Sequence, residues 1–247
     1  MSAAPDQGSM EKPEQRSGEK SQKTEKLSIN QRLNEFVQKN RKGLFLGLVA
    51  VIILLVGSII TLTVREKINT NAFSKVDAFN QRYEELKTYI GSEAPDAASR
   101  QTEIEALLNE LESFAAGKSG FAAARAYSVS AGIYEAEKKW AEAEKAWIDA
   151  AKAAGKSYLA PISLYNAAVA AEEQGNTESA IELYNQTLNY ENGVLVAVRA
   201  QFSIGRLEES RNNREAALEA YKSLVGKWPM DPLWANLAQN RIMILSD

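Results

Sequence analysis

The chain has 247 residues, of which 25% are charged and 45% are hydrophobic, as is typical of one sizeable domain or two small ones. It contains no Cys and no His, which excludes thiol nucleophiles, Ser-His-Asp catalysis, the usual zinc sites and lipidation at Cys. Residues 65–247 hold 20 Lys/Arg and 26 Asp/Glu, and a net charge of −6 is a poor match for a phosphate backbone. We therefore expect no enzyme, catalytic residue, metal, cofactor, small-molecule substrate or nucleic-acid partner.

The first part of the chain is polar and then becomes amphipathic. Residues 1–26 contain almost no large apolar side chain, which predicts a disordered tail that solvent surrounds, although contact with lipid or the ribosome is an alternative. In residues 27–43, apolar side chains recur at helical spacing, which predicts a short amphipathic helix beside a membrane. They are Leu27, Ile29, Leu33, Phe36 and Val37.

Residues 44–64 read LFLGLVAVIILLVGSIITLTV and hold no charge. A helix of this length spans about 32 Å, which matches a hydrocarbon core of about 30 Å. A buried soluble helix is rarely apolar on every side for so long. A cleaved signal peptide would have a shorter apolar stretch and a small-residue cleavage site, whereas LTVREK follows here. We expect an uncleaved, single-pass transmembrane anchor.

The charges that flank this segment predict its orientation. Six Lys and Arg residues lie within about twenty residues before it and four lie within a similar distance after it. The positive-inside rule then places the N-terminus in the cytoplasm and the C-terminal domain outside. For a bacterium, the expected location is the inner (cytoplasmic) membrane with a periplasmic C-terminal domain.

Residues 65–120 are predicted to form a helical N-terminal cap. A helix is expected over 66–90, continuing the membrane helix outward or starting anew, followed by a loop at 91–99 and a second helix over 100–115. The apolar face of the first helix consists of Phe73, Val76, Phe79, Tyr83, Leu86 and Ile90. No long stretch alternates apolar and polar residues, so no sheet is expected.

A segment then recurs with a period of 37 residues: AEAEKAW at 141–147, ESAIELY at 178–184 and EAALEAY at 215–221. Each copy has Ala followed four residues later by an aromatic residue. This pattern resembles the tetratricopeptide repeat, in which two antiparallel helices form each unit, although that family's period is about 34 residues. Residues 121–230 would hold three repeats, at about 124–160, 161–197 and 198–230. Thr177 is the expected N-cap of the second helix of repeat two.

The resemblance implies a scaffold and a groove. Within the scaffold, the alanines would let the helices of a repeat approach, and the aromatic residues would fill the wedge between hairpins. The scaffold residues are Ala143, Trp147, Ala180, Tyr184, Ala217 and Tyr221. The first helix of each repeat would line a concave protein-binding groove. The groove positions are Arg125, Ser128, Gly132, Tyr165, Val169, Glu172, Arg199, Phe202, Arg206 and Glu209.

Residues 231–247 are predicted to form a C-terminal capping helix, with Asp231 as N-cap and Pro232 at the first helical position. The residues expected to face inward are Leu233, Trp234, Leu237, Ile242 and Leu245. The predicted fold class is therefore all-α: one N-terminal transmembrane helix plus an α-solenoid of tetratricopeptide-like helical hairpins.

The whole arrangement resembles the ancillary SecYEG translocon subunit (YfgM-like) family over roughly residues 27–247. Most of the resemblance depends on two short segments, Lys39-Asn40-Arg41-Lys42-Gly43 before the span and Arg241-Ile242 near the end. It implies an inner-membrane protein that associates with the Sec translocon, SecYEG, and with a periplasmic peptidyl-prolyl isomerase, and that helps newly exported chains. The expected function is a protein-binding adaptor or chaperone cofactor. A structural scaffold for an envelope or cell-division assembly, with one fixed partner, is the alternative.

Overall fold

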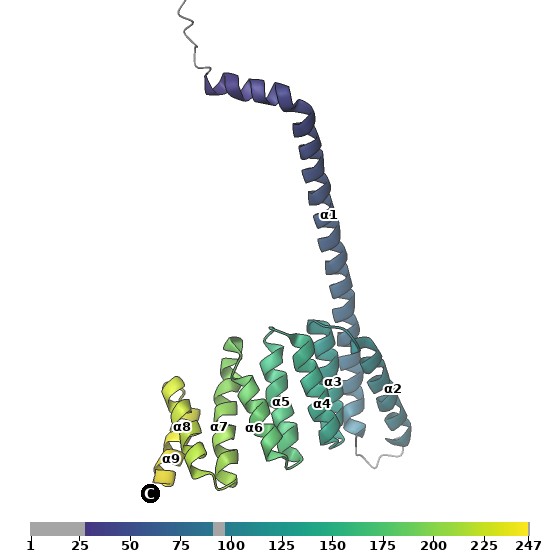
Figure 1. The fold of residues 1–247 in the computed structure, drawn as a ribbon. Helices are drawn as coiled ribbons and strands as arrows, with labels where there is room; N and C mark the ends of the chain where they lie inside the picture. Colours follow the sequence, from purple (N-terminus) through teal and green to yellow (C-terminus); the bar gives the residue numbers. More distant parts are fainter. Residues whose placement is uncertain (1–27, 91–96, 247) are drawn as a thin grey trace, which may run out of the picture. The chain divides into compact units, whose positions relative to one another are not determined.

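The computed structural model describes residues 28–90 and 97–246, and every regular element in these ranges is helical (Figure 1). The tail expected over residues 1–26 lies outside the described residues. The chain divides into two compact units, residues 1–62 and 63–247. The all-α class predicted from the sequence is confirmed for the described ranges.

Helix α1 runs from Ile29 to Leu86 and contributes to both units. Its start is a capping box, since Ser28 N–H donates to Gln31 Oε1 at 2.9 Å and Gln31 N–H donates to Ser28 Oγ at 3.4 Å. Within the described residues, the segments expected at 27–43, 44–64 and 66–90 form one continuous helix from Ile29 to Leu86. Of the two alternatives for the helix expected over 66–90, the structure shows the continuation of the apolar helix.

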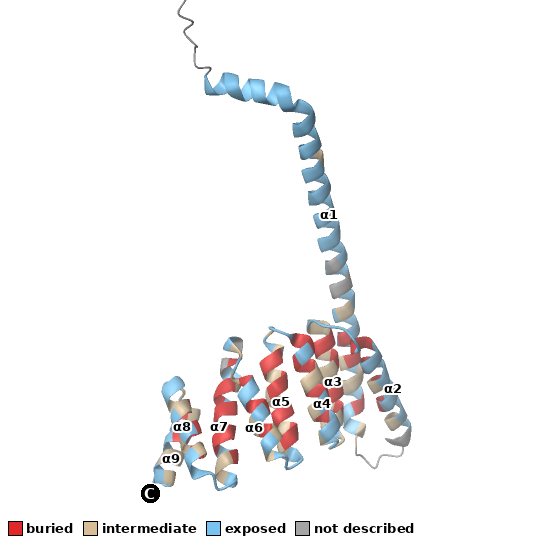
Figure 2. Ribbon diagram, viewed as in Figure 1, coloured by how far each residue is buried: buried red, intermediate tan, exposed pale blue. Residues whose placement is uncertain are grey.

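The apolar part of α1 is long enough and apolar enough to cross a membrane. Within Ile29–Val64, the most apolar stretch of 18 residues has a mean hydropathy of 2.9, and none of this stretch is buried by the protein (Figure 2). Two of its hydroxyl groups are satisfied by the helix itself, because Ser58 Oγ donates to Leu54 O at 2.7 Å and Thr61 Oγ1 donates to Ser58 O at 2.8 Å. Such internal pairing is what an environment without water requires.

In the second unit, the C-terminal part of α1 ends in a 3-10 turn, η1 (Lys87–Tyr89), and α2 follows (Ala97–Ala115). Helix α2 starts at Ala97, inside the region expected to be a loop up to residue 99. Val76, Phe79 and Leu86 are buried against α2 and α3, as their predicted face requires, whereas Phe73 at the edge is 37% exposed. The ring of Phe73 instead meets Phe121 edge-on, with centroids 6.0 Å apart.

Antiparallel helix pairs then stack side by side (Figure 1). Their bounds are α3 (Phe121–Ala136), α4 (Trp140–Ala154), α5 (Leu159–Glu173), α6 (Thr177–Thr187), η2 (Glu191–Gly193), α7 (Val194–Ser210), α8 (Arg214–Lys227) and α9 (Trp234–Ser246). Buried residues occur in every helix of this stack and form three hydrophobic clusters (Figure 2). Many of them are alanines, whose small side chains let neighbouring helices approach closely.

Two helix starts differ from the predictions. The N-cap of α6 is Asn176, whose side chain accepts from Ser179 N–H, and Thr177 is the first helical residue. Asp231 does accept backbone hydrogen bonds, from Leu233 and Trp234 N–H, but α9 begins only at Trp234, so Pro232 is not its first residue. An Asx-type turn therefore separates the cap residue from the helix.

The expected inward face of α9 is partly wrong. Trp234, Ile242 and Leu245 pack on the core, but Leu233 and Leu237 are 56% and 38% exposed. The buried residues of α9 are Ala235 and Ala238.

Candidate protein-binding groove

Each helix pair closes through a residue at the same position of the 37-residue period. Lys138, Gly175 and Asn212 have φ angles of 58°, 75° and 60°, all in the left-handed region. Only the second is glycine, which adopts this conformation without a steric cost. Three equivalent turns make α3–α4, α5–α6 and α7–α8 three copies of one hairpin.

The residues assigned to the scaffold lie inside this stack. Ala143, Ala180 and Ala217 have no exposed surface, and Tyr184 and Tyr221 are each 1% exposed. Trp147 is 9% exposed. A residue larger than alanine at the three small positions would need displacement of a neighbouring helix.

A hydrogen bond that the sequence analysis missed recurs in all three hairpins. Trp147 Nε1 donates to Glu135 Oε1 at 2.7 Å, Tyr184 Oη donates to Glu172 Oε1 at 2.6 Å, and Tyr221 Oη donates to Glu209 Oε2 at 3.2 Å. In each case the second helix of a hairpin donates to a carboxylate on the first. We call these three carboxylates the carboxylate ladder.

Two members of the carboxylate ladder also pair with the following helix of the stack. Arg206 of α7 forms an ion pair with Glu172 of α5, and Arg241 of α9 forms one with Glu209 of α7, with Arg241 Nε at 3.1 Å from Oε2. Each of these carboxylates thus joins both helices of its own hairpin to the next element. The ladder therefore helps to hold the register between hairpins.

Burial changes the acid–base properties of the groups along the ladder. Burial raises the pKa of Tyr184, and its hydrogen bond to the Glu172 carboxylate raises it further. Burial also raises the pKa of Tyr221, against the opposing effect of Arg206. The pKa of Glu135 is raised by burial, and the hydrogen bond from Trp147 opposes that rise. The tyrosines therefore stay protonated and act as donors.

The predicted groove residues of hairpins two and three come together on α5 and α7. The Tyr165 ring lies 5.3 Å from the Tyr184 ring, and Phe202 repeats this contact with Tyr221 at 5.3 Å. Phe202 also meets Trp234 of α9 at 5.2 Å. Both groove aromatics thus lie on scaffold aromatics and are only partly exposed. Val169 is half-buried beside them.

Two of the predicted groove residues of hairpin one, Arg125 and Gly132, contact α1. Arg125 is paired with Asp77 of α1 at 2.7 Å, and Tyr83 Oη of α1 donates to the Gly132 carbonyl at 3.1 Å. Ser128 donates to the carbonyl of Ala124, in its own helix. The C-terminal part of α1 therefore covers this end of the predicted groove, which shortens the surface open to a partner.

Arg199 is an exposed groove residue of α7. It lines an open cleft of about 560 Å³ at the start of α7, together with residues of α8 and the segment that leads to α9. Apolar side chains dominate the cleft, and Leu195 and Met230 at its rim are 87% and 90% exposed. The cleft is lined by Leu195, Val198, Arg199, Lys227, Trp228, Pro229, Met230, Asp231, Pro232 and Trp234.

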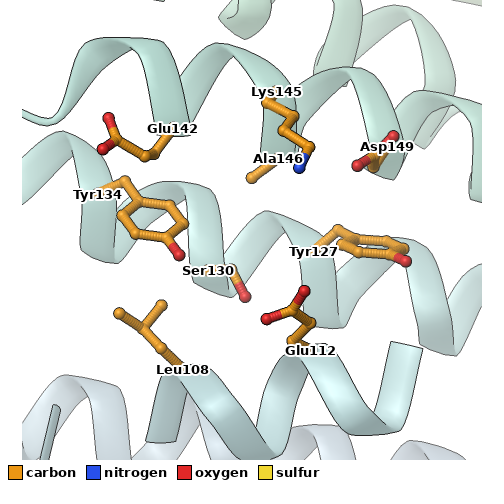
Figure 3. A pocket seen from close by; sticks show the side chains of 9 residues that line it. All are labelled: Leu108, Glu112, Tyr127, Ser130, Tyr134, Glu142, Lys145, Ala146 and Asp149. Carbon is orange, nitrogen blue, oxygen red and sulfur yellow. The ribbon is translucent and has the colours of Figure 1, made fainter. Parts of the chain in front are cut away.

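A second hollow, of about 130 Å³, opens among α2, α3 and α4 (Figure 3). The sequence analysis did not identify it, because α2 lies outside the recognised repeats. Burial raises the pKa of its two tyrosines, Tyr127 and Tyr134, and the Glu112 carboxylate adds to both shifts. Its lining consists of Leu108, Glu112, Tyr127, Ser130, Tyr134, Glu142, Lys145, Ala146 and Asp149.

Comparison with known proteins supports the repeat assignment. Residues 133–193 and 165–232 match the family model of the tetratricopeptide repeat. A "TPR repeat-containing protein" from Treponema pallidum (strain Nichols) is 38% identical over 93 residues. The alignment covers 38% of this chain and 38% of that relative, so the two correspond over about two-fifths of their lengths. Residues 133–232 are thus built from tetratricopeptide repeats, whose stacked hairpins form concave surfaces of the kind used in protein binding.

Proposed function

We propose that this protein is a membrane-anchored adaptor that binds exported proteins next to the Sec translocon, with its repeat unit outside the cytoplasm. The observation that carries the proposal is the series of elements in one chain. An apolar helix that the protein does not bury precedes, in the same chain, a stack of repeats whose α5–α7 face carries Tyr165, Val169 and Phe202. An anchored groove acts at high local concentration, so that individually weak contacts suffice.

The translocon as the site of action is supported by the sequence resemblance to the ancillary translocon subunits. Under this proposal the protein binds SecYEG and a periplasmic peptidyl-prolyl isomerase, and its groove holds chains that emerge from the channel. The partly exposed aromatic and aliphatic residues on α5 and α7 suit extended segments that are not yet folded. The acidic character of residues 65–247 favours basic segments over acidic ones.

The alternative is a structural scaffold for an envelope or cell-division assembly. The open apolar cleft beside Arg199 favours it as the second candidate, because an exposed rim formed by Leu195 and Met230 suits one fixed partner surface. The two functions differ in the number of partners. A scaffold holds a single partner at fixed stoichiometry, whereas an adaptor for exported chains contacts many.

Crosslinking in native membranes, followed by mild-detergent purification of the full chain, distinguishes them. The adaptor predicts recovery of translocon subunits together with many nascent exported proteins. Recovery of one stoichiometric envelope protein without translocon subunits would refute it and support the scaffold. A variant with Tyr165→Ala and Phe202→Ala tests whether the groove is responsible. It leaves the apolar span unchanged and should reduce the recovery of exported chains.

Orientation is tested separately, by adding protease to spheroplasts. Digestion of residues 65–247 from outside, with the N-terminal segment protected, is the result expected for an extracytoplasmic repeat unit. Protection of the repeat unit until the membrane is permeabilised would reverse the proposed topology.

A further inference from the structure

The carboxylate ladder is incomplete at one position. Glu172 and Glu209 each have an arginine from the next helix of the stack, Arg206 and Arg241. Glu135 is the equivalent residue of hairpin one, 37 positions before Glu172. It accepts the same bond from its hairpin aromatic, Trp147, but it forms no ion pair with any residue that the structure describes.

The sequence explains the gap. Arg206 of α7, which pairs with Glu172 of α5, lies 37 positions after Val169. Val169 therefore occupies on α5 the position from which an arginine would reach Glu135 of α3. Valine supplies no positive charge and is too short to cover the carboxylate. A half-buried carboxylate without a counter-ion is unfavourable, since burial penalises its charged form. Burial does raise the pKa of Glu135.

We propose that an arginine or lysine side chain of a bound partner protein completes the ladder at Glu135. This inference rests on the proposed adaptor function and names the chemistry that its groove recognises. The cation would lie between α3 and α5, bonded to the Glu135 carboxylate, with its methylene stem against Val169 and the neighbouring Tyr165. Arginine fits best, because its planar guanidinium forms two parallel hydrogen bonds with a carboxylate.

Several features make this position accessible to a partner and selective for a cation. Glu135 and Val169 are both half-buried, not enclosed, and belong to the repeat face that carries the groove. Tyr83 closes the side toward α1 by donating to the Gly132 carbonyl, and it carries no charge that would compete. Glu172, the next carboxylate along, is already neutralised by Arg206. The partner's cation therefore meets one unpaired carboxylate beside an apolar residue.

The test uses the full chain in detergent micelles and two peptide probes. One is an acetylated pentapeptide amide, Ala-Leu-Arg-Leu-Ala, and the other carries citrulline, which has the same shape but no charge, in place of arginine. Binding is followed through the indole N–H resonance of Trp147, because this group donates to Glu135. The arginine probe is expected to bind at least about tenfold more tightly than the citrulline probe, as for a charge-assisted hydrogen-bonded pair.

Two variants should abolish this preference by different routes. Glu135→Gln removes the charge, and Val169→Arg supplies the missing guanidinium from within, as Arg206 does in the next hairpin. Glu105→Gln, at an exposed position of α2, is the control: it removes one negative charge outside the ladder and should keep the preference. Equal binding of the two probes to the unmodified chain would overturn the assignment. So would a preference that persists in either Glu135→Gln or Val169→Arg.

Crosslinking in membranes separates this inference from the adaptor function. If Val169→Arg still recovers translocon subunits and exported chains in unchanged amounts, the adaptor function stands and the cation site is refuted. If the arginine preference is present in micelles but no translocon subunit is recovered, the cation site stands and the adaptor function is refuted.

Discussion

Tyr184, in the second helix of its hairpin, donates its phenolic hydrogen at 2.6 Å to Glu172, twelve positions earlier in the first helix. The same acceptor forms the ion pair with Arg206 of the next hairpin. One carboxylate thus links three helices, α5, α6 and α7. The equivalent bonds from Trp147 and Tyr221 show that this is a property of the repeat and not of one position.

Removing the tyrosine hydroxyl should weaken the stack without changing its packing. Tyr184→Phe removes a hydrogen bond to a charged acceptor, which contributes about 1.5–3 kcal/mol. We expect the free energy of unfolding to fall within that range, measured by urea titration in detergent with circular dichroism. Tyr158→Phe, at a side chain that is 56% exposed, is the control and should change stability by less than about 0.5 kcal/mol. A similar loss in both variants would contradict this role of the ladder.

Gly205 should not tolerate a methyl group. A Cβ added there would lie 2.6 Å from Cε1 of the buried Tyr221 ring, so the ring or the helix must move. We expect Gly205→Ala to destabilise the fold by about 1–3 kcal/mol through overpacking, despite the better helix propensity of alanine. Gly132→Ala is the matched control, because its Cβ would meet Tyr83 at an ordinary 3.5 Å. The control should leave stability unchanged or raise it by up to about 1 kcal/mol.

The three equivalent turns predict opposite effects of glycine. Lys138 has φ 58°, a conformation that costs a non-glycine residue about 1–2 kcal/mol. Lys138→Gly should therefore raise the midpoint of thermal unfolding, with a net gain of about 0.5–1 kcal/mol after the entropy of glycine in the unfolded chain is included. Gly175→Ala, the reverse change in the next hairpin, should lower the midpoint. A fall in both variants would show that these turns do not limit stability.

The raised pKa of Glu135 predicts a pH dependence of stability. Its folded-state pKa lies above the ordinary value of 4.5, so the folded state binds more protons in the interval between the two values. Stability should therefore fall as pH rises from 4.5 through the folded-state pKa. Glu135→Gln keeps an acceptor for Trp147 and lacks the charge, so it should be more stable than the unmodified chain near pH 7 and lose this advantage below pH 4.5.

The measurement is the unfolding midpoint of the unmodified chain and of Glu135→Gln between pH 3.5 and about 7.5. Carboxyl groups with an ordinary or a raised pKa titrate in about this range. Glu105→Gln, at an exposed position of α2, is the control for the loss of one negative charge. A pH profile of Glu135→Gln that runs parallel to that of the unmodified chain would contradict the prediction.

The apolar part of α1 should anchor the protein through its lack of charge. Replacing Leu54 and Leu55 with lysine places two charges at the centre of the span, each at an insertion cost of about 2.5–3.5 kcal/mol. We expect the doubly substituted protein to move from the membrane pellet to the supernatant after carbonate extraction. Leu54→Ala with Leu55→Ala should remain in the pellet, and loss of both variants to the supernatant would argue against a spanning helix.

Much of the fold can be read from local pattern. The charge-free stretch after Gly43 predicts the long apolar helix, because a segment of this length without a charge is typical of a membrane span and not of a helix in water. Ala180 and Tyr184 each have a counterpart 37 residues before and after them, and this spacing predicts the hairpins. In a stack of repeats, residues separated by one period occupy equivalent positions in successive units. Helix starts were less accurate: Asn176 and Thr177 are both acceptable caps, and the choice between them depends on turn geometry set by Gly175.

The composition and period of the sequence determined the helical class, the apolar anchor and the existence of repeats, because each follows from side chains near one another along the chain. Only the tertiary structure decided which groove residues are open. Arg125 and Gly132 lie under α1 and Phe202 lies between two aromatic rings, and these contacts join residues distant in sequence. The position of Glu135 in the ladder also emerged only there, because an ion pair depends on how one hairpin packs on the next, and no local pattern encodes that distance.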